Sequence, residues 1–211
     1  MAKPRSKRST PLTRDAIVGA AREMLDTADL DSLSLRRLAA ALGVTAPALY
    51  AHVEDKGDLL AAVAEQGFAE LVDAFDAVDA DDPVDRLLGY SRAYVDKAVS
   101  DPEVFKVMFI FRPGMVPLPD VDNELPAATA AFDRPIETIA AAIAAGEIHP
   151  DRDPVLTALT LWTTAHGVAS VLLLGSSGGR VVLPDNADAL IDDVLEVTLA
   201  GLRQPPRRHR H

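Results

Sequence analysis

The 211-residue chain has no cysteine and few aromatic residues, and each shortage narrows the range of possible functions. Without cysteine there is no disulfide framework, no thiolate zinc site and no cysteine nucleophile. Aromatic residues make up only 5 % of the chain, but apolar residues of all kinds reach 48 %, which is enough for a sizeable core. No apolar stretch follows the basic N-terminus, so we expect no secretory signal.

The motifs of several enzyme classes are missing as well. The chain has no His-Glu-x-x-His, no Glu-x-x-His pair and no glycine-rich phosphate loop. Its five histidines form no cluster with metal-ligand spacing within a helix. We therefore expect no enzymatic activity, no cofactor and no metal. A helical-bundle enzyme is the alternative, and the metal or cofactor content of the purified protein would reveal it.

The charge of the chain is strongly acidic but unevenly distributed. The formal net charge is −11. The first 58 residues carry nine Lys and Arg against eight Asp and Glu, whereas the remainder carries twelve against twenty-four. Because DNA repels the acidic remainder, only the N-terminal part is suited to face DNA.

One segment has to be distinguished from a membrane span. Residues 156–175 contain no Asp, Glu, Lys or Arg, as a transmembrane helix would require. The same segment holds six Thr, Ser and His side chains, which are unfavourable against lipid. We expect a helix that is buried in protein on most sides, and a cytoplasmic protein that does not enter a membrane.

Helix-start signals dominate the chain, and strand-like alternation is confined to residues 180–183. Asp precedes Pro at residues 82–83, 101–102 and 153–154, which places a capping residue before a proline in the first turn. The pattern predicts an all-α protein of about nine helices. The expected ranges are 13–27, 35–42, 46–52, 56–78, 83–100, 102–110, 124–146, 154–174 and 186–202.

A helix-turn-helix is expected within residues 33–60, LSLRRLAAALGVTAPALYAHVEDKGDLL. Gly43 can end the first helix in the left-handed conformation, while Val44 and Leu49 fill the space between the two helices. Thr45 caps the second, short helix. The other side chains of that helix are left largely outward, where they can enter a major groove.

This segment closely resembles the DNA-binding domain of the TetR family of repressors over residues 11–71. The matching features are the Gly-Val-Thr turn, the Leu-Tyr-x-His-Val run and the Lys-x-x-Leu-Leu start of the following helix. The resemblance implies base contacts from the front of the second helix and phosphate contacts around it. The DNA-contacting residues that it implies are Ser34, Arg36, Thr45, Ala46, Pro47, Ala48, Tyr50, His52 and Lys56.

Not all of these residues have a single interpretation. The ring of Tyr50 can pack against the core while its hydroxyl contacts a phosphate, and His52 can instead cap a helix or pack locally. Arg36 is the one member able to contact guanine in a bidentate manner.

Residues 80–203 are expected to form a second helical domain. Trp162, His166 and Gly167 resemble the Trp-x-x-x-His-Gly signature of one class of TetR-like C-terminal domains. The resemblance implies a homodimer in which two helices from each subunit form a four-helix bundle. A cavity for a small apolar effector is expected among the middle helices, although aromatic residues at this spacing are also found as plain core. The residues expected around the cavity are Phe105, Phe109, Phe132, Ile136, Trp162 and His166.

The sequence thus predicts a homodimeric repressor that binds double-stranded, palindromic operator DNA and is released by a small molecule. The helix expected at residues 56–78 would link the DNA-binding and sensing parts. A DNA-binding protein without a ligand is the second alternative, and ligand-dependent release from DNA would separate the two.

Overall fold

The computed structural model describes residues 11–109, 125–176 and 187–206, and all of the regular structure in these ranges is helical. This confirms the all-α prediction, while residues 180–183 lie outside the described ranges. A short 3-10 turn, which the sequence analysis did not predict, spans Leu30–Ser32. The α-helices are α1 (Arg14–Thr27), α2 (Leu35–Leu42), α3 (Ala46–Tyr50), α4 (Lys56–Asp76), α5 (Pro83–Ser100), α6 (Pro102–Phe109), α7 (Pro126–Ala144), α8 (Pro154–Ser176) and α9 (Ala187–Leu202).

Side-chain caps explain why most helices begin where the sequence predicts. A side-chain oxygen just before each of six helices accepts a backbone N–H of the first turn. These oxygens satisfy donors that the start of a helix leaves without an intrahelical partner. The six capping residues are Thr13, Ser34, Thr45, Asp55, Asp82 and Asp153.

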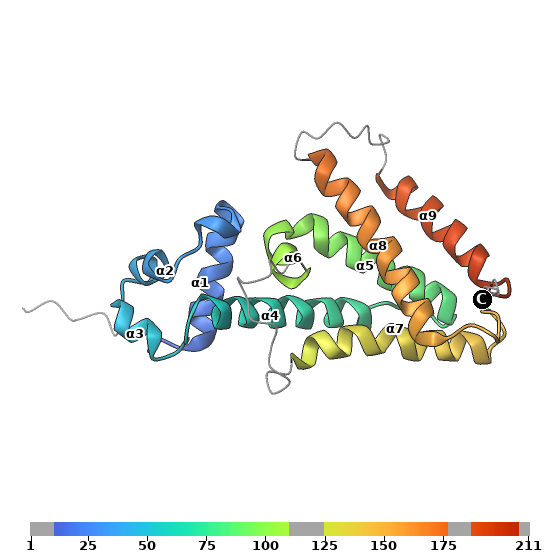
Figure 1. Cartoon of the computed structure of the whole chain (residues 1–211), viewed down its shortest axis with the longest axis horizontal. Helices are drawn as coiled ribbons and strands as arrows, with labels where there is room; N and C mark the ends of the chain where they lie inside the picture. The colour runs from blue at the N-terminus through green and yellow to red at the C-terminus, as the bar shows by residue number, and fades with distance from the viewer. Residues whose placement is uncertain (1–10, 110–124, 177–186, 207–211) are drawn as a thin grey trace, which may run out of the picture.

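The helix α4 connects the two ends of the molecule. Figure 1 shows α1, α2 and α3 at one end and α7, α8 and α9 toward the other, with α4 running from the first group into the second. Near its start α4 packs against α1, and along its length it packs against α5, α6 and α7. Its inner face is fully buried at Leu59 and Val63. This continuous helix therefore links the two groups directly.

In the single chain, α8 is less buried than the sequence analysis expected. Only 28 % of the most apolar stretch of Pro154–Gly175 is buried, and by length and composition this helix could cross a membrane. The other helices of the chain, α5, α7 and α9, leave part of α8 uncovered. The exposed large apolar residues on α8 and α9 are Val155, Leu156, Leu159, Leu174 and Val197.

Candidate nucleic-acid interface and ligand cavity

Gly43 forms the turn between α2 and α3 as the sequence predicted. Its φ angle is +67°, and its N–H donates to the carbonyl of Ala40 at 3.2 Å. The next N–H, of Val44, donates to the carbonyl of Ala39 at 3.0 Å, so two of the four carbonyls in the last turn of α2 are satisfied. Apart from Gly43 and its two chain neighbours, no residue has a heavy atom within 4 Å of the position that a Cβ would take at Gly43. Glycine is therefore needed for its backbone conformation and not for close packing.

The predicted DNA-contacting residues lie together on α2, on α3 and on the segments next to them. Leu49 is completely buried beneath α3, whereas Tyr50 is 53 % exposed. Three members of the set are half-buried, namely Ser34, Ala46 and Lys56. The exposed members are Arg36, Thr45, Pro47, Ala48, Tyr50 and His52.

Two capping hydroxyls of this surface keep a hydrogen for another partner. The Ser34 Oγ accepts from the N–H of Arg37 at 3.3 Å, and the Thr45 Oγ1 accepts from the N–H of Ala48 at 3.4 Å. A hydroxyl that accepts in this way can still donate its own hydrogen. Each hydroxyl is thus available to a phosphate oxygen, the commonest partner of side chains in protein–DNA interfaces.

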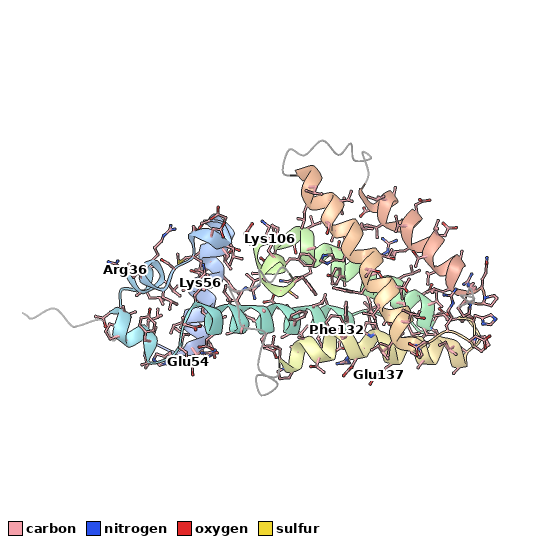
Figure 2. The ribbon with its side chains drawn as sticks, in the orientation of Figure 1. Arg36, Glu54, Lys56, Lys106, Phe132 and Glu137 are labelled. Carbon is pink, nitrogen blue, oxygen red and sulfur yellow. The ribbon has the colours of Figure 1, made fainter. Side chains whose placement is uncertain are left out.

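The two neighbouring arginines of α2 are in different situations. Arg37 is held by its hydrogen bond to the carbonyl of Ser32 at 2.8 Å. Arg36 is exposed and makes no hydrogen bond or ion pair within the described part of the chain. Figure 2 shows Arg36 on α2, at the end of the molecule that holds α3. Its guanidinium donors are free to contact a guanine or a phosphate.

Lys56 is less accessible than the sequence comparison implied. Its side chain lies at the start of α4 (Figure 2) and is half-buried, and its Nζ donates to the carbonyl of Leu30 at 3.2 Å. The N–H of the same residue, Leu30, donates to Glu103 Oε2 on α6 at 3.2 Å. The turn after α1 is therefore held from α4 on one side and from α6 on the other.

Arg14 on α1 holds the end of α3 in place, a role that the sequence analysis did not predict. Its Nη1 donates to the carbonyl of His52 at 2.8 Å and to Asp58 Oδ2 at 2.9 Å. The hydrogen bond from Arg14 holds the pKa of Asp58 below its usual value. Because His52 follows α3 and Asp58 lies in the first turn of α4, these bonds fix α1, α3 and α4 as one unit.

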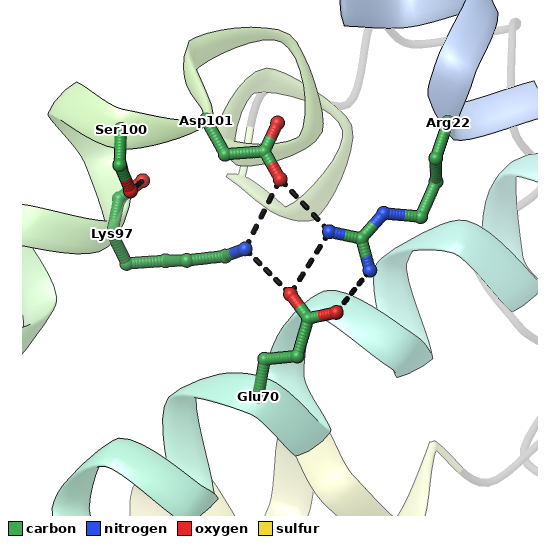
Figure 3. Close-up of polar contacts among 5 residues, drawn as sticks. All are labelled: Arg22, Glu70, Lys97, Ser100 and Asp101. Carbon is green, nitrogen blue, oxygen red and sulfur yellow. Dashed lines mark hydrogen bonds and ion pairs between the residues drawn. The ribbon is translucent and has the colours of Figure 1, made fainter. Parts of the chain in front are cut away.

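A cluster of four charged side chains joins α1 to α4 and α5 (Figure 3). Arg22 pairs with both Glu70 and Asp101, and Lys97 donates to Glu70 at 2.6 Å and to Asp101 at 3.1 Å. Burial raises the pKa of Glu70, but the bonds from Arg22 and Lys97 outweigh it, so the pKa lies below its usual value. Asp101, expected as a cap of α6, thus also connects that helix to the DNA-binding part.

A largely apolar cavity lies among α4, α5, α6, α7 and α8. Its volume is about 50 Å³. Phe109, Phe132 and Trp162, three of the residues that the sequence placed around a cavity, line it. Phe132 is 40 % exposed and lies at the open side. Tyr90 and Ser91 also line the cavity but were not predicted.

The other three residues predicted around the cavity do not line it. Phe105 and His166 lie behind the wall against Tyr94, with ring centroids 5.4 Å and 6.2 Å from that of the tyrosine. Ile136 does not line the cavity, although its neighbour Pro135 does. Successive side chains of a helix differ in direction by about 100°, so the two residues face different ways. Within the described ranges, no three His, Asp or Glu side chains come together as a metal site.

Two family models match the chain. The model described as "Tetracyclin repressor-like, C-terminal domain" matches residues 87–198, and the model "Bacterial regulatory proteins, tetR family" matches residues 17–63. An uncharacterized HTH-type transcriptional regulator of Mycobacterium tuberculosis is 28 % identical over 93 % of this chain and 84 % of its own length. The class C tetracycline repressor of Escherichia coli is 46 % identical over 26 % of this chain and 25 % of its own.

Solved structures show the same fold over nearly the whole length. A protein of unknown function from Rhodococcus is 29 % identical with a TM-score of 0.75, covering 90 % of this chain and 95 % of its own. A TetR variant from Acinetobacter baumannii, in complex with minocycline, is 24 % identical with a TM-score of 0.66, covering 90 % and 96 %. With matches in both the helix-turn-helix and most of the second part, the chain belongs to the TetR family of DNA-binding transcriptional regulators.

Proposed function

We propose that this protein is a homodimeric cytoplasmic repressor that binds a palindromic operator through α3 and leaves it when a small molecule occupies the cavity. The proposed DNA-binding domain spans residues 11–71, and the proposed sensing and dimerising domain spans residues 80–203. The observation that carries the proposal is the surface of α2 and α3. On this surface Arg36 is exposed and has no partner among the described residues, while the buried Leu49 anchors α3 in the core.

The residues of this surface divide into two groups by chemistry. Thr45, Ala46, Pro47 and Ala48 form the front of α3 and would face the edges of bases, with the alanine methyl groups suited to thymine. Arg36 would add a guanine contact from α2. The residues left for phosphate contacts are Ser34, Tyr50, His52 and Lys56, which fix the register of the protein on the duplex.

The dimer would form through the uncovered faces of α8 and α9. Five large apolar side chains on these helices are exposed in the single chain, which is unusual for a face that stays in water. A second copy related by a two-fold axis would cover them with the same surface. The two α3 helices could then contact half-sites one helical turn, about 34–36 Å, apart.

The link between cavity and DNA would run through α6 and α4. Phe109 at the end of α6 lines the cavity, whereas Glu103 near its start holds the N–H of Leu30 next to the DNA-binding helices. A ligand that favours a displaced α6 would therefore also move the reading helices. A difference in binding energy of about 1–3 kcal/mol between the two states gives a 5–150-fold change in operator affinity.

The proposal is tested by selecting bound fragments from random duplex DNA and measuring their affinity by fluorescence anisotropy. We expect enrichment of an inverted repeat whose half-sites are separated by one helical turn. Ala48→Asp places a negative charge on exposed α3 and should abolish binding to the selected site. Ala140→Asp makes the same change at an exposed position of α7 and should leave binding intact. Absence of any enriched sequence, or equal effects of the two variants, would contradict the proposal.

A further inference from the structure

The described wall of the cavity has no charged side chain. Its polar atoms come from Ser91, Tyr94, Trp162 and Tyr90, and the last of these also borders a separate, more polar groove between α4, α5 and α7. An ionised carboxylate or amine placed in the cavity would lose its hydration without gaining a partner of opposite charge. The cavity therefore favours molecules that are uncharged at neutral pH.

Tyr94 is buried with most of its hydrogen-bonding capacity in use. The Nε1–H of Trp162 donates to its hydroxyl oxygen at 3.0 Å, and Nδ1 of His166 lies 2.8 Å from the same oxygen. Burial raises the pKa of Tyr94 and lowers the pKa of His166, so both groups are neutral at pH 7.

The position of the shared proton follows from the cost of an unpaired donor. If His166 donated to Tyr94, the tyrosine hydrogen would be left unpaired inside the protein, which is unfavourable. If Tyr94 donates to His166, that hydrogen is bonded and one lone pair of the tyrosine oxygen stays free. The hydroxyl of Ser91 also keeps a free lone pair, because it donates its hydrogen to the carbonyl of Leu87 at 3.0 Å. Both hydroxyls therefore present acceptors to a ligand.

The shape of the wall adds a second restriction. Trp162 lies between Phe109 and Phe132, with ring centroids at 6.2 Å and 5.8 Å, so a flat ring in the cavity finds aromatic surfaces to contact. The small volume favours a compact molecule. We propose that the effector is a compact, uncharged aromatic molecule of the phenol or indole class, whose O–H or N–H group donates to the Tyr94 oxygen. This inference rests on the proposed function and names the ligand class of the sensing cavity.

Trp162 provides the readout, because it is the one tryptophan of the chain and lies on the cavity wall. The full-length protein is titrated with phenol, toluene and benzoate at pH 7 while the tryptophan fluorescence is recorded. Phenol and toluene have nearly the same shape and differ in the O–H donor, whereas benzoate is an anion. In Tyr94→Phe the affinity for phenol should fall about fivefold to tenfold, while that for toluene should not change. Benzoate should bind neither protein.

A second variant reverses the expected preference. His166→Leu removes the acceptor of the Tyr94 hydrogen, so the hydroxyl gains a free donor. Benzonitrile, which accepts a hydrogen bond but cannot donate one, should then bind about fivefold more tightly than it binds the wild type. Thermal unfolding of both variants verifies that they are folded at the temperature of the titrations.

Three results would overturn the inference. The first is benzoate binding as tightly as phenol, and the second is a fluorescence response to phenol that does not saturate. The third is an equal loss of affinity for phenol and for toluene in Tyr94→Phe. Operator binding is measured on the same samples. If no DNA sequence is preferred while phenol binds as expected, the proposed function fails and the ligand class stands. If the operator is bound and phenol is not, the ligand class fails and the DNA-binding function stands.

Discussion

At the scale of single residues, the helix-turn-helix uses the same groups for folding and for recognition. The hydroxyls of Ser34 and Thr45 accept backbone N–H groups and keep a hydrogen for DNA. Replacing either by alanine would remove a cap, at a cost of about 1 kcal/mol, together with a proposed contact to DNA. Residues with a single role are therefore better tests, and Gly43 and Arg36 are two such residues.

Gly43→Ala should destabilise the protein by about 1–2 kcal/mol, because alanine is strained at a φ angle of +67°. Gly19→Ala is the matched control, since it lies in the middle of α1, has no positive φ angle and has open space around it. There alanine should stabilise the protein by about 0.5–1 kcal/mol. Urea unfolding followed by circular dichroism measures both changes. Similar effects at the two positions would show that the backbone angle is not what selects glycine at residue 43.

Arg36→Ala should weaken operator binding by about 1–3 kcal/mol and relax the preference at one base pair in each half-site. The reason is that the exposed guanidinium of Arg36 is unpaired within the described residues and able to contact guanine. Arg37→Ala is the matched control, because Arg37 is tied to the carbonyl of Ser32. Affinities for the operator and for single-base variants measure the effect. If Arg36→Ala leaves the ratio of the affinities for operator and random DNA unchanged, Arg36 contacts only a phosphate and does not read a base.

At the scale of secondary structure, the helices could be predicted because their ends are determined locally. Asp82 before Pro83 and Gly43 after α2 act within one turn of chain, so their effect is visible in the sequence. The 3-10 turn at Leu30–Ser32 was missed, because it is also held by Glu103 and Lys56 from distant helices.

The candidate site could be predicted only in part, for a similar reason. Periodicity predicts which face of a helix is apolar, but not which apolar residues border a cavity. Phe109, Phe132 and Trp162 line it, while Ile136, an equally apolar residue on α7, does not. Tyr90 lies four residues before Tyr94 on one face of α5, and this spacing is a signal that could have added Tyr90 to the prediction.

The charged cluster between α1, α4 and α5 should make stability depend on pH in the acidic range. The pKa of Glu70 is lowered below its ordinary value of 4.5 in the folded protein. Its contribution is therefore fully present above the unfolded pKa and is lost as the pH falls through the folded pKa. Glu70→Gln should be less stable than the wild type at pH 7, and the two proteins should converge toward pH 3.

Urea midpoints measured between pH 7 and pH 3 provide this comparison. Glu137→Gln is the control, because Glu137 is exposed on α7 away from the cluster (Figure 2). It should follow the wild type at every pH. A constant difference between Glu70→Gln and the wild type across the range would mean that the ionised form of Glu70 does not stabilise the fold.

At the scale of the whole molecule, charge and apolar surface are separated along the chain. The net charge of the first 58 residues is close to zero, whereas the remainder is strongly acidic. An acidic second part is repelled by the DNA backbone, so it favours approach with α3 foremost. The uncovered apolar faces of α8 and α9 lie in this acidic part, at the far end from the reading helices (Figure 1). Dimerisation there would place both α3 helices on the same duplex.

Val197→Glu should therefore convert the proposed dimer into a monomer and weaken operator binding. Val197 is 67 % exposed on α9 in the single chain, and a carboxylate at the centre of an apolar interface would be buried without a partner. The monomer would contact one half-site at a time. Losing the second, linked contact should lower the affinity by about 10²–10⁴-fold.

Val99→Glu is the matched control for this change, because Val99 is also a valine, is 50 % exposed and lies on α5. It should remain a dimer and bind the operator as the wild type does. Sedimentation velocity measures the oligomeric state, and anisotropy with the full operator and with an isolated half-site measures the affinity. In Val197→Glu the two DNAs should bind almost equally, since the second half-site adds nothing for a monomer. A Val197→Glu protein that sediments as a dimer would show that the exposed apolar face of α9 is not the interface.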